Sequence, residues 1–177
     1  MPHGPAQALH DAKLYLASGG ADVRWEAREK YHCTLLFLGD TPEETLAPLA
    51  SGIAAAAGRI HPFPLAYGGI GFFPNRDRPR VIWGGVADPT GLLETLQSRV
   101  ASAAAALLPV LPSDGYRPHV TLGRIRGERN LGRLIQRSES CTFEHPPVTH
   151  REVYIVKSQL QSGGSVHTIL HTLPLAG

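Results

Sequence analysis

The sequence has few of the features that mark a disulfide-bonded, zinc-binding or membrane-spanning protein. Its 177 residues include two cysteines, Cys33 and Cys141, which show neither metal-ligand spacing nor the pattern of a disulfide framework. No apolar run reaches the length that crosses a bilayer, and the N-terminus lacks the charged-then-apolar pattern of a signal peptide. We therefore expect a cytoplasmic protein that makes no membrane contact.

The net charge is also small. The chain has 17 lysines and arginines against 15 aspartates and glutamates, a formal charge of +2, and it has no polybasic tail. Any attraction for phosphate must then come from local clusters of basic side chains. The length is enough to bury a sizeable core, and we expect one bilobal domain spanning residues 1–177.

The most informative pattern that is present is a repeated tetrad, His-x-Thr-Leu. It occurs in KYHCTLLFLGD, with His32 and Thr34, and again in YRPHVTLGRI, with His119 and Thr121. Each copy lies in a short apolar run rich in β-branched and aromatic residues, which predicts a strand. Side chains alternate faces along a strand, so each histidine and its threonine point the same way, about 7 Å apart. If the two strands face each other, one cleft holds two imidazoles and two hydroxyls.

These four groups are suited to cleaving a phosphodiester. Histidine has an ordinary pKa of about 6.5, so one imidazole can act as a base toward water while the other acts as an acid toward the leaving oxygen. The threonine hydroxyls can donate hydrogen bonds to the non-bridging oxygens. No residue cluster has metal-ligand spacing, so we expect a reaction without metal or cofactor. A single tetrad is common by chance, and a histidine in a strand is more often structural, but the matching parity of two copies favours a functional interpretation.

Hydrophobic periodicity and capping residues predict alternating helices and strands. The first predicted helix covers about Pro5 to Ala17, with Leu9, Leu14 and Leu16 toward the core. The second is capped by Thr41, with Pro42 and Glu44 in its first turn, and ends near Gly58. The third is opened by Asp88-Pro89 and stopped by Pro109, and the fourth covers about Asn130 to Gln136. The predicted strands are the two tetrads and the segments from about Phe63 to Phe73, Val81 to Val86, Val153 to Leu160 and Val166 to Leu173.

The order strand, helix, strand, strand occurs twice, in step with the repeated tetrad. This order predicts an α+β fold with two similar lobes, each a mostly antiparallel sheet backed by helices. The two HxTL motifs would lie in a central cleft.

Longer blocks of sequence surround the tetrads. RWEAREKYHCTLLFLGD is similar to a W-x(5–6)-H-x-T-L-x-F-L-G block, and GGIGFFPNRDRPRVIWGGV, YRPHVTLGR and EVYIVKSQLQSGGSVHTIL are similar to the blocks that follow it, in order. These blocks are typical of the 2H phosphoesterase superfamily, and the chain most resembles its RNA 2′,3′-cyclic phosphodiesterase branch, historically labelled 2′-5′ RNA ligase. The resemblance covers nearly everything from about Arg24 onward.

Two features depart from the family pattern. Members usually open with an apolar strand before the first helix, whereas this chain begins MPHGPAQALHDAKLYLA, directly in a predicted helix. Either the sheet lacks one strand or the recorded start lies downstream of the true one. In the tail, His167 stands where the family has a tyrosine. This replacement weakens any substrate contact transferred to that position and leaves the tetrads untouched.

The resemblance implies two substrate-binding residues outside the tetrads. Phe37 would stack on the base, and Arg124 would contact phosphate or ribose, where its fork can donate two hydrogen bonds at once. Each lies five residues after its motif's histidine, so strand parity turns both away from the cleft, and core packing is the alternative for Phe37. A bulge or strand end must intervene if the implied contacts form. The family's arrangement also suggests His32 as acid and His119 as base, but the near-symmetry of the copies leaves this open.

Other basic side chains form two groups that are candidates for guiding RNA, with a solvated arginine face as the alternative. The groups are Arg76, Arg78 and Arg80 in one turn, and Arg126, Arg129, Arg133 and Arg137 near one helical face. The remaining histidines share no spacing and are expected at the surface: His3, His10, His61, His145, His150 and His171.

We therefore expect an enzyme that opens RNA 2′,3′-cyclic phosphate ends to 2′-phosphomonoesters, with RNA, including tRNA fragments, as its partner and no obligate protein partner. The same site would run backwards as weak 2′-5′ joining. Two alternatives stay open: a phosphodiesterase for small cyclic nucleotides or ADP-ribose 1″,2″-cyclic phosphate, and a non-catalytic RNA-end-binding protein. The intact tetrads argue against the latter, because binding alone would not require both histidines.

Overall fold

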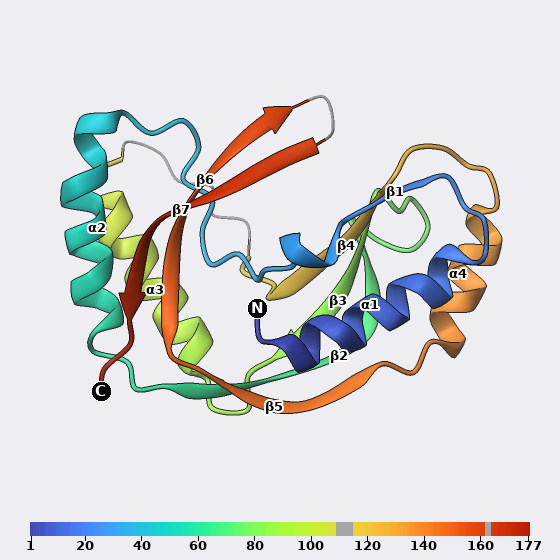
Figure 1. The fold of residues 1–177 in the computed structure, drawn as a ribbon, viewed down its shortest axis with the longest axis horizontal. Helices are drawn as coiled ribbons and strands as arrows, with labels where there is room; N and C mark the ends of the chain where they lie inside the picture. Colours follow the sequence, from blue (N-terminus) through green and yellow to red (C-terminus); the bar gives the residue numbers. More distant parts are fainter. Residues whose placement is uncertain (109–114, 162–163) are drawn as a thin grey trace. The chain divides into compact units, whose positions relative to one another are not determined.

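Helices and strands alternate along the chain in an α+β fold, as predicted (Figure 1). The computed structural model describes residues 1–108, 115–161 and 164–177. It contains two compact units. The first comprises Met1–Thr34, Leu65–Pro89 and Arg117–Val148, and the second comprises Leu35–Pro64, Thr90–Tyr116 and Thr149–Gly177. Among the described residues, no helix is both long enough and apolar enough to cross a membrane.

A five-stranded sheet forms the centre of the first unit. Its strand order is β1 (Val23–Trp25), β4 (His119–Ile125), β3 (Val81–Ala87), β2 (Phe63–Phe73) and β5 (Glu144–His150). The pairs β1–β4, β4–β3 and β3–β2 are antiparallel. The predicted strands at β2, β3 and the second tetrad are therefore confirmed.

Sequence periodicity missed two strands of this sheet, β1 and β5. β1 has three residues, too few for an alternating pattern to be recognised. β5 contains Pro146 and Pro147, which argue against a central strand. Because β5 lies at the edge of the sheet, a proline there removes no ladder hydrogen bond that the fold needs.

The strand predicted over the first tetrad is wrong. A single turn of 3₁₀ helix, η1 (Arg28–Lys30), precedes the tetrad, and the segment that follows forms one isolated antiparallel bridge, Cys33 to Val120. β1 already pairs with the outer edge of β4, so the chain leaves that edge after Trp25 and returns to it only at Cys33.

One face of the sheet packs against α1 (His3–Ala17), which confirms the first predicted helix. A Cβ added to Gly84 in β3 would lie 2.3 Å from Leu9 Cδ2, so the helix and strand are in close contact there. Leu9, Leu16, Ile82 and Val120 are fully buried at 0% exposure. Figure 1 shows α1 running along this sheet.

Leu14 was expected in the core, but its side chain is 53% exposed. Leu9 and Leu16 are separated by two helical turns and share a face, whereas Leu14 lies about 140° around the helix from Leu9 at 3.6 residues per turn. The prediction for Leu14 is therefore wrong, because the buried face of α1 is too narrow to include all of its leucines.

The last helix of the first unit, α4 (Leu131–Ser140), confirms the predicted basic helix and extends it by one turn. It starts after Asn130, whose φ of 55° lies in the left-handed region that asparagine tolerates. Leu134 is fully buried on the inner face of this helix.

The second unit contains α2 (Glu43–Ala57) and α3 (Leu92–Ala105) side by side, and a two-stranded antiparallel ribbon of β6 (Glu152–Gln161) and β7 (Gly164–Pro174) (Figure 1). Both strands of the ribbon were predicted. The core of this unit includes the buried side chains of Leu49, Ile53, Leu93, Leu96 and Val100.

The predicted starts of these two helices are wrong in detail. Thr41 does not cap α2, because Pro42 occupies the N-cap position and the Thr41 hydroxyl donates to the Gly39 carbonyl at 3.4 Å. α3 begins at Leu92, after a left-handed Gly91 (φ 73°), rather than at Asp88-Pro89. The end of α2 at Gly58 is as predicted, but α3 ends at Ala105. Pro109 lies outside the described residues.

Truncating the two leucines of α1 tests this core assignment. We expect Leu9→Ala to lower the free energy of unfolding by about 2–5 kcal/mol, because it leaves a cavity between helix and sheet. The matched control Leu14→Ala removes the same atoms from the exposed face and should change it by less than about 0.5 kcal/mol. Equal losses in urea unfolding would contradict the packing described.

Candidate active site

The two tetrads lie next to each other in the first unit. The antiparallel bridge joins Cys33 to Val120, so the residues that flank these two also face each other across the bridge. His32 is therefore opposite Thr121, and Thr34 is opposite His119. The structure thus brings together all four residues that the repeated tetrad singled out.

All four side chains point away from the core. In β4, Val120 is fully buried, while its neighbours His119 and Thr121 are half-buried on the other face. In the first tetrad, Cys33 is half-buried and its neighbours are exposed. The face opposite α1 therefore carries two imidazoles and two hydroxyls at the corners of one small patch, which we call the tetrad patch (His32, Thr34, His119 and Thr121).

Tyr31 holds the first tetrad in this orientation although the tetrad is not a strand. Its side chain is 3% exposed and lies 6.0 Å from the Lys13 ammonium of α1, measured to the ring centroid. Lys13 also donates to the Glu26 carbonyl at 3.1 Å. Burial, with the carboxylates of Glu26 and Glu29, raises the pKa of the Tyr31 phenol, and burial lowers the pKa of Lys13 against the opposing effect of Glu29. Tyr31 and Cys33 thus face inward, and the histidine between them faces outward.

Both imidazoles are oriented by the same backbone contact. His32 Nδ1 lies 2.7 Å from the Lys30 carbonyl oxygen, and His119 Nδ1 lies 2.7 Å from the Arg117 carbonyl oxygen. A carbonyl oxygen can only accept, so each Nδ1 must carry the hydrogen and donate it. Each Nε2 is then the nitrogen that gains or loses a proton.

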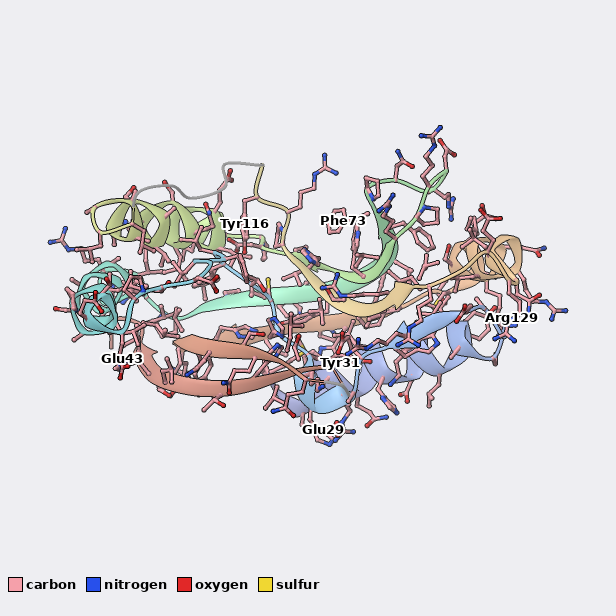
Figure 2. All side chains as sticks on the ribbon, turned by 90° about the horizontal axis from the view of Figure 1, so that it is seen from above. Glu29, Tyr31, Glu43, Phe73, Tyr116 and Arg129 are labelled. Atoms are coloured by element: carbon pink, nitrogen blue, oxygen red, sulfur yellow. The ribbon has the colours of Figure 1, made fainter. Side chains whose placement is uncertain are left out.

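Aromatic side chains fix the plane of the second imidazole. The rings of Phe73 and His119 meet edge to face, with centroids 4.8 Å apart and planes at 83°. Trp83 lies 5.2 Å from Phe73 and 6.3 Å from His119, centroid to centroid. Figure 2 shows Phe73 on the side of the sheet away from α1. A place for Phe73 and Trp83 beside the tetrads was not predicted, because an aromatic residue in a strand carries no signal in the sequence that separates a site residue from a core residue.

A β-bulge in β4 determines where Arg124 points. Opposite β3, the register runs Gly85 to His119 and Trp83 to Thr121, then shifts by one residue so that Val81 pairs with Arg124. Alternate residues of β3 share a face, so Arg124 lies on the same face as His119 and Thr121. The structure thus contains the break in alternation that the implied phosphate contact requires, and the contact itself stays a prediction.

Phe37 lies in the second unit, in the loop before α2, and 70% of its side chain is exposed. This exposure excludes the core-packing alternative. Its stacking on a base stays a prediction. His167 is exposed on β7, opposite Ser158.

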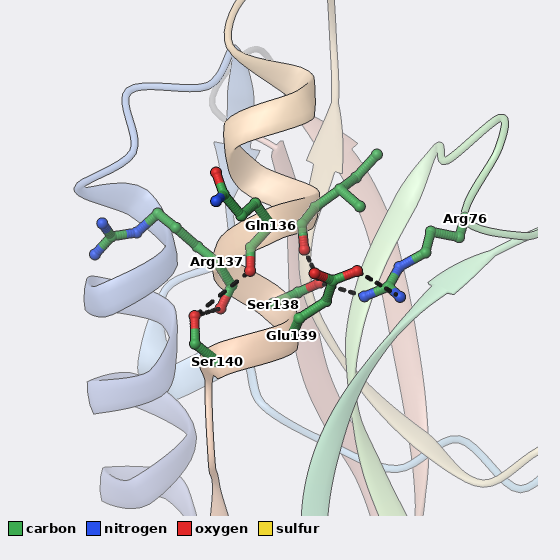
Figure 3. Close-up of polar contacts among 7 residues, drawn as sticks. Arg76, Gln136, Arg137, Ser138, Glu139 and Ser140 are labelled. Carbon is green, nitrogen blue, oxygen red and sulfur yellow. Dashed lines mark hydrogen bonds and ion pairs between the residues drawn. The ribbon is translucent and has the colours of Figure 1, made fainter.

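Part of the arginine surface has a structural role (Figure 3). Arg76 forms an ion pair with Glu139 at 3.2 Å and donates to Ser138 Oγ at 3.1 Å. Arg137 donates to the Tyr15 carbonyl at 3.0 and 2.7 Å, where α1 ends, and its guanidinium lies 4.1 Å from the centroid of that tyrosine ring. Arg76 and Arg137 therefore hold α4 in place, and a role of the two arginine groups in guiding RNA stays a prediction.

Two further observations bear on the chemistry of the patch. Among the residues that the structure describes, no three His, Cys, Asp or Glu side chains cluster closely enough to hold a metal ion. Of the six histidines expected at the surface, His3 and His61 are exposed, and the other four are half-buried: His10, His145, His150 and His171. Burial lowers the pKa of His150.

Comparison with known proteins identifies the family. Residues 1–83 match the model described as LigT like Phosphoesterase. The RNA 2′,3′-cyclic phosphodiesterase of Aquifex aeolicus (strain VF5) is 30% identical over 158 residues, which cover 87% of this chain and 82% of that protein. The protein of the same name from Aeropyrum pernix is 30% identical over 162 residues, 91% of each chain. The chain belongs to the LigT-like phosphoesterase family.

The fold is also similar to that of a solved structure. The TT0787 protein of Thermus thermophilus superposes with a TM-score of 0.83 at 24% identity, covering 100% of this chain and 94% of that one. The family resemblance and the α+β fold expected from the sequence are thus confirmed.

Nitrogen NMR of histidine-labelled protein tests the orientation of the imidazoles. We expect His32 and His119, when neutral, to carry the hydrogen on Nδ1, because each donates to a backbone carbonyl. His61 is exposed and makes no hydrogen bond in the described structure, so it serves as the control in the same spectrum. A hydrogen on Nε2 of either tetrad histidine would contradict the geometry.

Proposed function

We propose that the protein hydrolyses RNA 2′,3′-cyclic phosphate ends to 2′-phosphomonoesters. The observation that carries the proposal is the bridge between Cys33 and Val120, supported by the matching contact of each histidine Nδ1 with the carbonyl oxygen two residues before it. The names of the relatives from Aquifex aeolicus and Aeropyrum pernix support the choice of substrate. Protein groups alone supply the proton transfers in this proposal.

The patch is arranged for an in-line displacement. Opposite residues across an antiparallel pair alternate, so His32 and His119 occupy one diagonal, about 7–8 Å apart, and the two threonines occupy the other. A phosphate between them meets one imidazole on the side of the attacking water and the other on the side of the leaving oxygen. The threonine hydroxyls lie where they can donate to the non-bridging oxygens, whose charge develops in the transition state.

The proton balance follows from this geometry. The basic imidazole takes a proton from water at Nε2 as the oxygen bonds to phosphorus. The bond from phosphorus to O3′ breaks, and the acidic imidazole delivers its Nε2 proton to O3′, leaving the phosphate on O2′. The geometry is nearly symmetric, so we assign His32 as the acid and His119 as the base on the family resemblance alone. A 5′-hydroxyl in place of water would give 2′-5′ joining, with the base taking the proton of that hydroxyl and the acid again delivering its proton to O3′. In the reverse of either reaction, where O3′ attacks the phosphorus and water or the 5′-hydroxyl leaves, the two roles exchange.

Removal of either imidazole tests the two-histidine mechanism. His32→Ala and His119→Ala should each lower kcat by about 10²- to 10⁴-fold, because each removes one proton transfer. Binding of a 2′-phosphate-ended oligonucleotide should stay measurable by calorimetry. His61→Ala, which removes an exposed imidazole outside the patch, should leave kcat unchanged. A single tetrad variant with near-wild-type kcat would refute the mechanism.

Analysis of the product and chelation separate the proposal from its alternatives. A cyclic-ended oligonucleotide should yield a 2′-phosphomonoester, and exhaustive treatment with EDTA should leave kcat unchanged. A 3′-phosphate product would reverse the assignment of the leaving oxygen. Loss of activity with rescue by a divalent ion would overturn the metal-free reaction, and binding without turnover would favour an RNA-end-binding protein.

A further inference from the structure

Two arginines face each other across the outer strand pair of the sheet. In the register of β1 and β4, Arg24 pairs directly with Arg124. Side chains at directly opposite positions share a face, with Cβ atoms about 4.5–5.5 Å apart, and like charges there destabilise the pair. Because Arg124 shares the face of the tetrad patch, Arg24 does too.

Within the part of the chain that the structure describes, no protein group offsets this repulsion. In residues 1–108, 115–161 and 164–177, neither guanidinium forms an ion pair or a hydrogen bond with a side chain or carbonyl. The carboxylates of the residues that flank β1, Asp22 and Glu26, make no ion pair with either arginine. Arg24 is half-buried and Arg124 is exposed, so both residues reach solvent, from which an anion can approach.

The charges at the patch indicate how many phosphates it accommodates. A cyclic phosphodiester carries one negative charge, which the protonated acid and Arg124 together already exceed. Arg24 adds a further positive charge beside Arg124. The partner of Arg124 in β3, Val81, lies two residues from Trp83, which pairs with Thr121 of the tetrad patch. A second anion would offset this extra charge, and in RNA the nearest one is the phosphodiester that joins the terminal nucleotide to the preceding one.

We propose that Arg24 binds this upstream phosphodiester and makes the protein selective for cyclic-ended oligonucleotides over cyclic mononucleotides. The inference rests on the proposed function. Arginine suits the task because its planar fork donates two parallel hydrogen bonds to a phosphate. Arg24 is a substrate-positioning residue in this account and takes no part in proton transfer.

The test compares a dinucleotide that ends in a 2′,3′-cyclic phosphate with the cyclic mononucleotide, which lacks the upstream nucleoside and its phosphodiester. Arg24→Ala should lower kcat/KM for the dinucleotide about 10- to 100-fold, the size expected of a hydrogen bond to a charged group, and mainly through KM. The mononucleotide should be turned over as by the wild type. Arg24→Lys should recover part of the loss, because it keeps the charge but not the fork.

A neutral linkage isolates the contact. Replacing the upstream phosphodiester by a methylphosphonate should reproduce the loss in the wild type, and Arg24→Ala should add no further loss on that substrate. Arg99→Ala is the matched control, because it removes the same charge from an exposed position on α3 in the second unit. Arg24→Gln, which keeps most of the side-chain stem, guards against a loss of packing, and its melting temperature is measured alongside.

Each result decides the matter. An equal loss on both substrates would move Arg24 to the cyclic phosphate and overturn the proposal, as would an Arg24→Gln variant that folds and behaves like the wild type. If the wild type turned over neither substrate, the proposed function would fail. Calorimetric Kd values for a 2′-phosphate-ended dinucleotide against a nucleoside 2′-monophosphate would then still show whether Arg24 binds the upstream phosphate.

Discussion

The bridge between Cys33 and Val120 is the constraint on which the rest of the site depends. An antiparallel bridge makes the flanking residues partners, so one contact sets each histidine of a tetrad against the threonine of the other. The inward packing of Tyr31 then determines which face of the first tetrad is exposed. A shift by one residue at this bridge would turn the first tetrad over and bury its histidine.

Positive charge is concentrated on the same face by a second backbone feature. The bulge in β4 returns Arg124 to the face of the tetrad patch. Glycine at position 123 permits the close approach of β1, because a Cβ there would lie 2.7 Å from Val23 Cγ1. The pairing of β1 with β4 adds Arg24 beside it. Like charges at opposite positions cost stability in the free protein, which is consistent with a surface that functions with an anion bound.

Much of the tetrad patch could be predicted from the sequence, because the spacing within each tetrad already puts its histidine and threonine on the same face. Side chains at the first tetrad still alternate between the two faces although the segment is not a strand, because Tyr31 and Cys33 face inward and the histidine between them faces outward. The face of Arg124 could not be predicted, because a bulge depends on pairing with a distant strand. Arg24 was missed for a related reason: three residues of β1 carry no periodic signal, and their partner is set only by the fold.

A crystal structure with a nucleoside 2′-monophosphate tests the central claim most directly. The account predicts one phosphate on the tetrad patch, with Nε2 of His32 and Nε2 of His119 within hydrogen-bond distance of oxygens on its opposite sides. The hydroxyls of Thr34 and Thr121 should contact the remaining oxygens. A phosphate bound away from the patch, or one that contacts a single histidine, would contradict the account.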